Sequence, residues 1–132
     1  MILNLKKAAL MIVMALPLIF LASCGESLEE QREDFLATYD VLETCTSGNY
    51  SYEIVITQSS TSEDGILISN LWDWSGSIDA TIDGNELTFT SQVVNGITIS
   101  GTGSLDEDEL TLNYDVLATE GNDACIATCT KK

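Results

Sequence analysis

Two tryptophans flank one acidic residue in Trp72-Asp73-Trp74, the part of this sequence best suited to contacting a ligand. In an extended segment residues i and i+2 point the same way, so both indoles are expected on one face. Two aromatic rings beside a carboxylate could stack on a sugar or hold a small apolar ligand. The alternative is that the pair plugs one end of the fold, since tryptophan is usually largely buried. Trp72 continues the apolar alternation of Ile66 and Ile68, which favours its burial, whereas Trp74 lies beyond that strand.

Catalytic groups are scarce. The chain contains no histidine, so the commonest general base and metal ligand is missing and Ser/His/Asp and Cys/His catalysis are excluded. Glycoside hydrolysis needs only two carboxylates, but most of the 21 acidic residues fall in turns or on polar strand faces. The Gly101-to-Ser104 stretch lacks the lysine and helix of a phosphate-binding loop. We expect no enzymatic activity, no cofactor and no nucleic-acid partner.

Two acidic stretches, residues 83–86 and 106–109, bring hard oxygen ligands close together, as calcium sites do. Neither has the spacing of an EF-hand loop, which requires glycine at its sixth position and glutamate at its twelfth. We therefore expect both stretches to be charged hairpin turns and predict no metal site.

Residues 1–23 have the parts of a secretory signal peptide: Lys6 and Lys7, then an uncharged stretch at 8–22, then small residues before Cys24. The stretch is shorter than the roughly 20 residues of a spanning helix, and Pro17 would break such a helix. The motif at 21–24, "LASC", resembles the lipobox of bacterial lipoproteins. That resemblance implies cleavage before Cys24 and acylation of this cysteine, which would anchor the chain to a membrane. Ordinary signal cleavage nearby is the alternative.

Removal of residues 1–23 leaves all 21 acidic residues but only Arg32, Lys131 and Lys132 as basic ones, a formal charge of −18. Such a chain repels nucleic acid and anionic surfaces. Glycine rather than aspartate follows Cys24, so the inner-membrane retention signal of enteric bacteria is absent and we expect an outer-membrane location. The acidic tether at 24–34 is similar to the surface-export signal of Bacteroidota lipoproteins, with a solvated spacer as the alternative. A capping-box pattern at 27–30 predicts a short helix over 28–35.

From residue 35 to residue 132 the apolar residues alternate with Thr, Ser and Asp, a pattern typical of half-buried antiparallel strands in one domain. Short Gly-, Asn- and Asp-containing turns separate the runs. The predicted strands cover 36–46, 50–59, 65–71, 77–83, 86–92, 96–105, 109–117 and 124–131. Because every connection is of hairpin length, all neighbours should be antiparallel. Pairing of the last strand with the first would remove both sheet edges, so we predict a closed, lipocalin-like barrel, with a two-sheet sandwich as the alternative.

Three cysteines remain when Cys24 is acylated, and an oxidising compartment favours their pairing. Cys125 and Cys129 lie on one predicted strand, and about 13 Å between their Cα atoms is too far for a disulfide. Cys45 must therefore be one partner. In a closed meander Cys45 and Cys125 lie at the same end of the barrel, which favours the Cys45–Cys125 bond, with Cys45–Cys129 as the alternative. The remaining thiol is expected to act as a small buried apolar residue.

Three segments of the chain resemble a group of small Bacteroidota lipoproteins: residues 35–45, "FLATYDVLETC", residues 48–52, "GNYSY", and residues 125–131, "CIATCTK". The resemblance covers nearly all of the chain after Cys24, and Ala37 departs from the usual glycine. It implies a lipocalin-like β domain. The function of that group is uncharacterised, so no site residues transfer.

Three functions are open at this stage. The first is a non-enzymatic, lipid-anchored binding or structural module of the outer membrane or cell surface. The second is a lipocalin-like carrier of a small ligand. The third is an inhibitor of a basic enzyme such as lysozyme, because small barrel lipoproteins of similar size inhibit lysozyme and a charge of −18 suits a basic partner. The partner classes left open are therefore a small molecule, a glycan and a basic protein.

Overall fold

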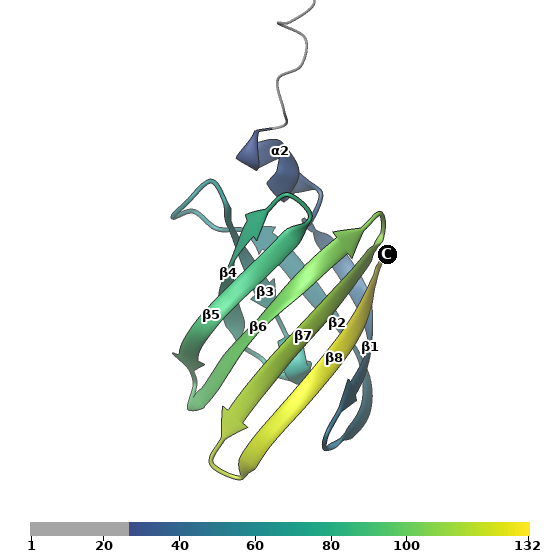
Figure 1. Cartoon of the computed structure of the whole chain (residues 1–132), viewed down its shortest axis with the longest axis vertical. Helices are drawn as coiled ribbons and strands as arrows, with labels where there is room; N and C mark the ends of the chain where they lie inside the picture. The colour runs from purple at the N-terminus through teal and green to yellow at the C-terminus, as the bar shows by residue number, and fades with distance from the viewer. Residues whose placement is uncertain (1–26) are drawn as a thin grey trace, which may run out of the picture.

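The computed structural model describes residues 27–132. Eight antiparallel strands follow one another around a closed barrel, in which β1 pairs with both β2 and β8 (Figure 1). This confirms the predicted eight-stranded, all-β closed barrel over the two-sheet sandwich. The predicted signal peptide, the motif that resembles a lipobox, and Cys24 lie outside the described residues. No helix within residues 27–132 has the length and apolar character needed to cross a membrane.

The strands lie close to the predicted ranges. They are Ala37–Cys45 (β1), Gly48–Gln58 (β2), Gly65–Ser69 (β3), Ser77–Asp83 (β4), Glu86–Val94 (β5), Ile97–Asp106 (β6), Glu109–Ala118 (β7) and Gly121–Lys131 (β8). The α-helix α2 spans Leu28–Glu33, and a 3-10 turn, η3, spans Leu71–Asp73. Ser27 caps α2 by accepting a hydrogen bond from the Glu30 backbone N–H at 3.3 Å, as the capping-box pattern predicted.

Apolar and polar residues alternate along each strand, and the apolar side chains fill the interior of the barrel. Inward positions hold aliphatic and aromatic side chains, and most of the intervening positions carry polar groups outside. Gly101 lies between Phe89 and Tyr114 in the ladders, and a Cβ there would collide with both side chains. Their ring centroids are 6.1 Å apart. The largest inward side chains, among them Tyr39, Phe89 and Leu112, expose less than 2% of their surface, whereas side chains around a ligand-sized cavity would be accessible to water. The barrel axis is therefore occupied by side chains.

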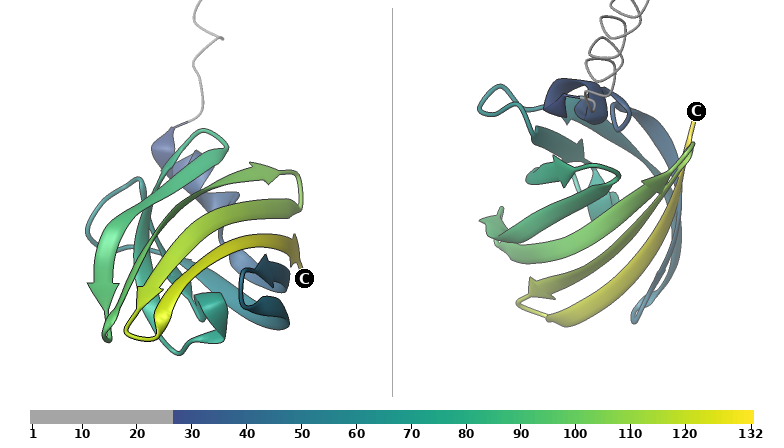
Figure 2. Two further views of the ribbon diagram at one scale, coloured as in Figure 1. Left: turned by 60° about the horizontal axis from the view of Figure 1, so that its bottom comes forward. Right: turned by 45° about the horizontal axis from the view of Figure 1, so that its top comes forward.

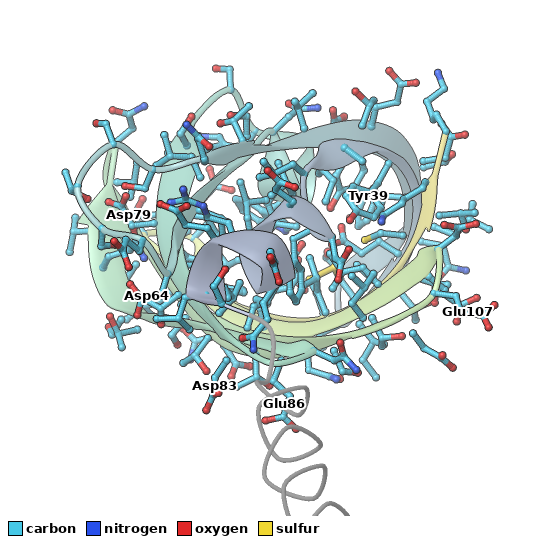
Figure 3. The ribbon with its side chains drawn as sticks, turned by 90° about the horizontal axis from the view of Figure 1, so that it is seen from above. Tyr39, Asp64, Asp79, Asp83, Glu86 and Glu107 are labelled. Atoms are coloured by element: carbon cyan, nitrogen blue, oxygen red, sulfur yellow. A yellow bond between two sulfur atoms is a disulfide. The ribbon has the colours of Figure 1, made fainter. Side chains whose placement is uncertain are left out.

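One end of the barrel is covered by α2, which lies across the opening (Figure 3). Phe35 is fully buried beneath the helix, and the Tyr39 hydroxyl donates a hydrogen bond to the Phe35 carbonyl at 2.8 Å. Arg32 is also buried and donates to the Ser62 carbonyl at 2.8 Å. This arginine ties the helix to the β2–β3 loop, so the end that carries the chain's N-terminal side is closed by packing and hydrogen bonds. We call it the helix end.

Within residues 27–132, no α-helix covers the other end. There η3 lies near the β1–β2 and β7–β8 turns (Figures 1 and 2). The disulfide between Cys45 and Cys125 joins β1 to β8 at this end, and it is the pairing that strand closure favoured. We call this the tryptophan end.

Candidate ligand-binding site at the tryptophan end

The segment that carries the tryptophans is a turn and not an extended strand. Strand β3 ends at Ser69, Leu71 instead of Trp72 takes the buried position, and both tryptophans are half-buried. The predicted continuation of the strand to residue 71, with Trp72 on its apolar face, was therefore wrong. The physical reason is that Asn70 adopts a left-handed backbone conformation with φ of 72°, which ends the alternation.

The backbone of this turn is strained. Trp72 has φ of 63° and Asp73 has φ of 50°. A bulky residue rarely adopts this left-handed region, and each such residue costs on the order of 1–3 kcal/mol unless its surroundings hold it there. Strain of this kind is concentrated in ligand clamps and other functional sites. The contacts that hold Trp72 in place therefore bear on what the turn does.

Asp123 is the centre of the network that holds the aromatic residues. Its Oδ2 accepts hydrogen bonds from the Trp72 indole Nε1 at 3.0 Å and from the Ser47 hydroxyl at 2.7 Å. Because the Ser47 hydroxyl donates its only proton to Asp123, the Tyr50 hydroxyl, 2.8 Å away, must donate to Ser47. Burial works to raise the pKa of Asp123, but the hydrogen bonds from Ser47 and Trp72 outweigh it and hold the pKa below its usual value. Asp123 is thus an ionised acceptor that positions Trp72 directly and Tyr50 through Ser47.

A second polar group lies deeper inside the barrel. Glu43 is 97% buried, since only 3% of its surface is exposed, and its Oε1 accepts hydrogen bonds from the hydroxyls of Tyr52, at 2.7 Å, and Tyr114. Tyr52 also accepts a hydrogen bond from the Trp72 backbone N–H at 3.0 Å. Burial raises the pKa of Glu43 above its usual value, and the hydrogen bonds from Tyr114 and Tyr52 oppose this shift without cancelling it. The strained turn is therefore connected through Tyr52 to a buried carboxyl group.

The side chains of Tyr50, Trp72, Asp73 and Trp74 line an open pocket of about 340 Å³. The Trp74 ring lies so close to Gly76 that a Cβ at that position would collide with it. Trp72 and Tyr50 have their polar atoms engaged by Asp123 and Ser47, so they present mainly ring carbon to the pocket. The structure thus places both predicted tryptophans together beside a carboxylate, and it adds Tyr50 to the group.

The remaining thiol, Cys129, is fully buried and unpaired. Burial raises its pKa to about 12, so the sulfur stays protonated and unreactive near neutral pH. Within residues 27–132, the side chains of Glu43, Cys45 and Cys125 have ligand atoms within 4.8 Å of one another. The two sulfurs are bonded to each other, so in this structure they are not metal ligands.

Other polar surfaces of the barrel are simpler. Residues 83–86 and 106–109 form the β4–β5 and β6–β7 hairpin turns, as predicted. Figure 3 shows Asp83, Glu86 and Glu107 directed away from the barrel. An open groove of about 400 Å³ beside β4 and β5 is lined mainly by serine and threonine hydroxyls. It has no aromatic ring, so the tryptophan end is the stronger candidate for a ligand site.

Sequence reasoning missed Glu43 and Asp123 as parts of this site. A signal was present, because each is an acid at an inward position of an otherwise apolar alternation, in β1 and β8 respectively. Tyr50 was missed as well, because nothing in its sequence neighbourhood indicates a ligand contact. It lies at the open rim, where 41% of its surface is exposed.

Comparison with known proteins does not identify a family for this chain. No protein-family model matches the chain, and no curated protein matches it in sequence. Among solved structures, it is similar to the zebrafish ileal bile-acid-binding protein in complex with cholic acid, with a TM-score of 0.43 and 9% identity over 75% of this chain and 99% of that one. A likeness this distant carries no argument about what the present chain binds.

Proposed function

We propose that this protein is a non-enzymatic, lipid-anchored module that binds a small ligand at the tryptophan end of its barrel. The observation that carries the proposal is the open pocket lined by Tyr50, Trp72, Asp73 and Trp74. Its rings are held by hydrogen bonds on a strained backbone, an arrangement that stability alone does not require. Half-exposed aromatic rings supply a large contact area with little entropy to lose on binding.

The anchor and the pocket would lie at opposite ends of the molecule. Ser27 begins the described chain at the helix end and is three residues from Cys24, so about 10 Å of extended chain would separate the two. Acylation of Cys24 would then hold the helix end toward the membrane, because two or more acyl chains anchor stably. The tryptophan end would face away from that membrane, where a dissolved ligand can reach it.

The carrier alternative takes a specific form in this barrel. Because side chains occupy the axis, a ligand inside the barrel would have to displace them. A ligand at the open tryptophan end needs no such rearrangement. We therefore place binding at the surface pocket, with one side of the ligand left in water.

Intrinsic fluorescence offers a direct test, because the two tryptophans of the chain both line the pocket. The full lipoprotein, purified in detergent, would be titrated with neutral oligosaccharides, fatty acids and organic ammonium salts. We expect at least one class to change the emission saturably. Trp74→Ala should abolish binding of that compound in a calorimetric titration.

Leu42→Ala is the matched control, because Leu42 is 68% exposed on the outer wall of β1, away from the pocket. It should leave binding unchanged. Binding that survives Trp74→Ala, or no emission change with any class, would contradict the proposed site. Separately, Cys24→Ser should release the protein from membranes, and persistence in the membrane fraction after a high-salt wash would contradict the anchor.

A further inference from the structure

We propose that the pocket at the tryptophan end is selective for a small organic cation with an alkylated ammonium group. This inference rests on the proposed function and names the chemical class of its ligand. It is carried by three features of the described residues: the aromatic residues that line the pocket, the exposed acidic residue Asp73 that lines it with them, and the excess of acidic over basic residues around the barrel.

The ring faces provide the first step. Aromatic faces carry a negative quadrupole, and tryptophan attracts cations most strongly. Trp72 and Tyr50 already use their polar atoms on Asp123 and Ser47, which leaves their ring surfaces for a ligand. Cages of aromatic rings are a known means of recognising quaternary ammonium groups.

Asp73 provides the second step. Its carboxylate is exposed at the pocket, and no basic side chain within residues 27–132 lies at this end to neutralise it. A ligand with an anionic group would be repelled there. A bound cation, in contrast, gains both the carboxylate and the ring faces.

The excess of acidic residues provides the third step. The three basic residues of the described chain all lie at the helix end: Arg32 in α2, and Lys131 and Lys132 at the end of β8. Lys132 forms an ion pair with Glu53, and Lys131 donates to the Asp34 carbonyl. The tryptophan end carries Glu120 and Asp123 in addition to Asp73. The helix end keeps an excess of acidic residues as well, in α2 and in the β4–β5 and β6–β7 turns. The negative potential therefore raises the concentration of cations around the whole barrel, and the aromatic residues of the pocket determine that they bind at the tryptophan end.

The type of cation follows from the scarcity of acceptors. A primary ammonium or a metal ion is strongly hydrated and needs several oxygen ligands in place of its water. Asp73 is the one acidic residue among those that line this pocket. An alkylated ammonium carries its charge behind methyl groups, so it can exchange water for ring carbon without leaving unsatisfied donors.

Choline and its neutral isostere 3,3-dimethylbutan-1-ol are the probes, because they have the same shape and differ in charge. Titration of the full lipoprotein in detergent, followed by tryptophan emission and ligand-observed NMR, should show choline binding at least about tenfold more tightly, in keeping with a partly desolvated cation–π contact plus a carboxylate. Salt should weaken choline binding through screening. Phosphatidylcholine vesicles supply the same trimethylammonium group on a lipid. Because the anchor would turn the tryptophan end away from the lipid surface, the vesicles should not change the tryptophan emission.

Asp73→Asn is the decisive variant, because asparagine tolerates the left-handed conformation that Asp73 adopts. It should weaken choline binding about fivefold or more and leave binding of the neutral isostere unchanged. Asp83→Asn is the control, because it makes the same change in net charge at the helix end, where β4 terminates. It should change choline binding less than about twofold, since salt screens a charge at the opposite end of the barrel from the pocket.

Equal affinity for choline and the isostere would overturn the cation inference while leaving an aromatic binding site in place. Choline binding that is insensitive to Asp73→Asn, or equally sensitive to Asp83→Asn, would overturn it as well. The absence of any emission change with choline would also overturn the cation inference. So would an emission change with phosphatidylcholine vesicles but not with free choline. A response to neutral sugars in these cases would preserve the proposed function, so the failures of the two proposals are distinguishable.

Discussion

The two ends of this barrel are closed in different ways. At the helix end, Phe35 and Tyr39 are fully buried under α2, and Arg32 ties that helix to a loop. At the tryptophan end, aromatic side chains remain half-exposed above buried carboxyl groups, and successive residues have left-handed backbones. The first end is built as ordinary core. The second departs from ordinary core in polarity, strain and exposure together, and such departures are expected where a protein binds something.

The largest expected effect is at the helix end. Phe35→Ala should lower the free energy of unfolding by about 3–5 kcal/mol, because it leaves a cavity under α2 in a small domain. Urea denaturation measures this loss. Leu28→Ala, at a position that is 42% exposed on the same helix, is the control and should change stability by no more than about 0.5 kcal/mol. A similar loss in both variants would show that the helix end is not closed by specific packing.

The disulfide gives the next effect. Replacing Cys45 and Cys125 together by serine should cost about 2–4 kcal/mol, because the bond closes a loop with a sequence separation of 80. Unreduced peptide mapping provides the independent check and should join a Cys45 peptide to a Cys125 peptide. A Cys45 peptide joined to Cys129 would contradict the β1–β8 register at the tryptophan end.

A smaller effect is expected at the centre of the tryptophan-end network. Asp123→Asn should cost about 1–3 kcal/mol, because the amide replaces an ionised acceptor of several hydrogen bonds. It should also shift the tryptophan emission, since the Trp72 indole loses its charged partner. Asp115→Asn, at an exposed position of the neighbouring strand β7, is the control for the change in net charge. Equal effects on emission would mean that Asp123 does not position Trp72.

Glu43→Gln should have the smallest effect at the pH of maximum stability, and its signature is a pH dependence. Because burial raises the pKa of Glu43, the folded state retains this proton longer than the unfolded chain does. Stability from this group is therefore complete below the unfolded pKa and falls as the pH rises toward the folded pKa. Melting curves from pH 4 to 8 should show that fall in the wild type and a weaker one in the variant. Parallel curves would count against a raised pKa.

The fold was largely predictable, because alternation of apolar and polar residues and short turns recur along the whole described chain. Strand β4 lies where it was expected, and β1 and β8 close the barrel. The end of β3 was predicted wrongly, since the left-handed conformation of Asn70 depends on the contacts of the turn after it. Local periodicity contains no information about such contacts.

The site was only partly predictable. The tryptophans were identified by their residue type and spacing, but their partners come from other strands, as in the Asp123–Trp72 pair, which is 51 residues apart in sequence. Glu43 and Asp123 interrupt the inward apolar pattern, and this interruption could have marked them as candidates. The sequence does not indicate the polar partners of Glu43 and Asp123, because these depend on the register of the closed barrel.

The most direct test of the account is the free energy of unfolding of Trp74→Ala, measured by urea denaturation at neutral pH beside Phe35→Ala. If the tryptophan end is a binding surface, the half-buried Trp74 should cost less than about 1.5 kcal/mol on truncation, well below the cost of a core aromatic residue. A loss of about 3–5 kcal/mol, equal to that of Phe35→Ala, would show that Trp74 closes the barrel as core and would contradict the assignment of this end to ligand binding.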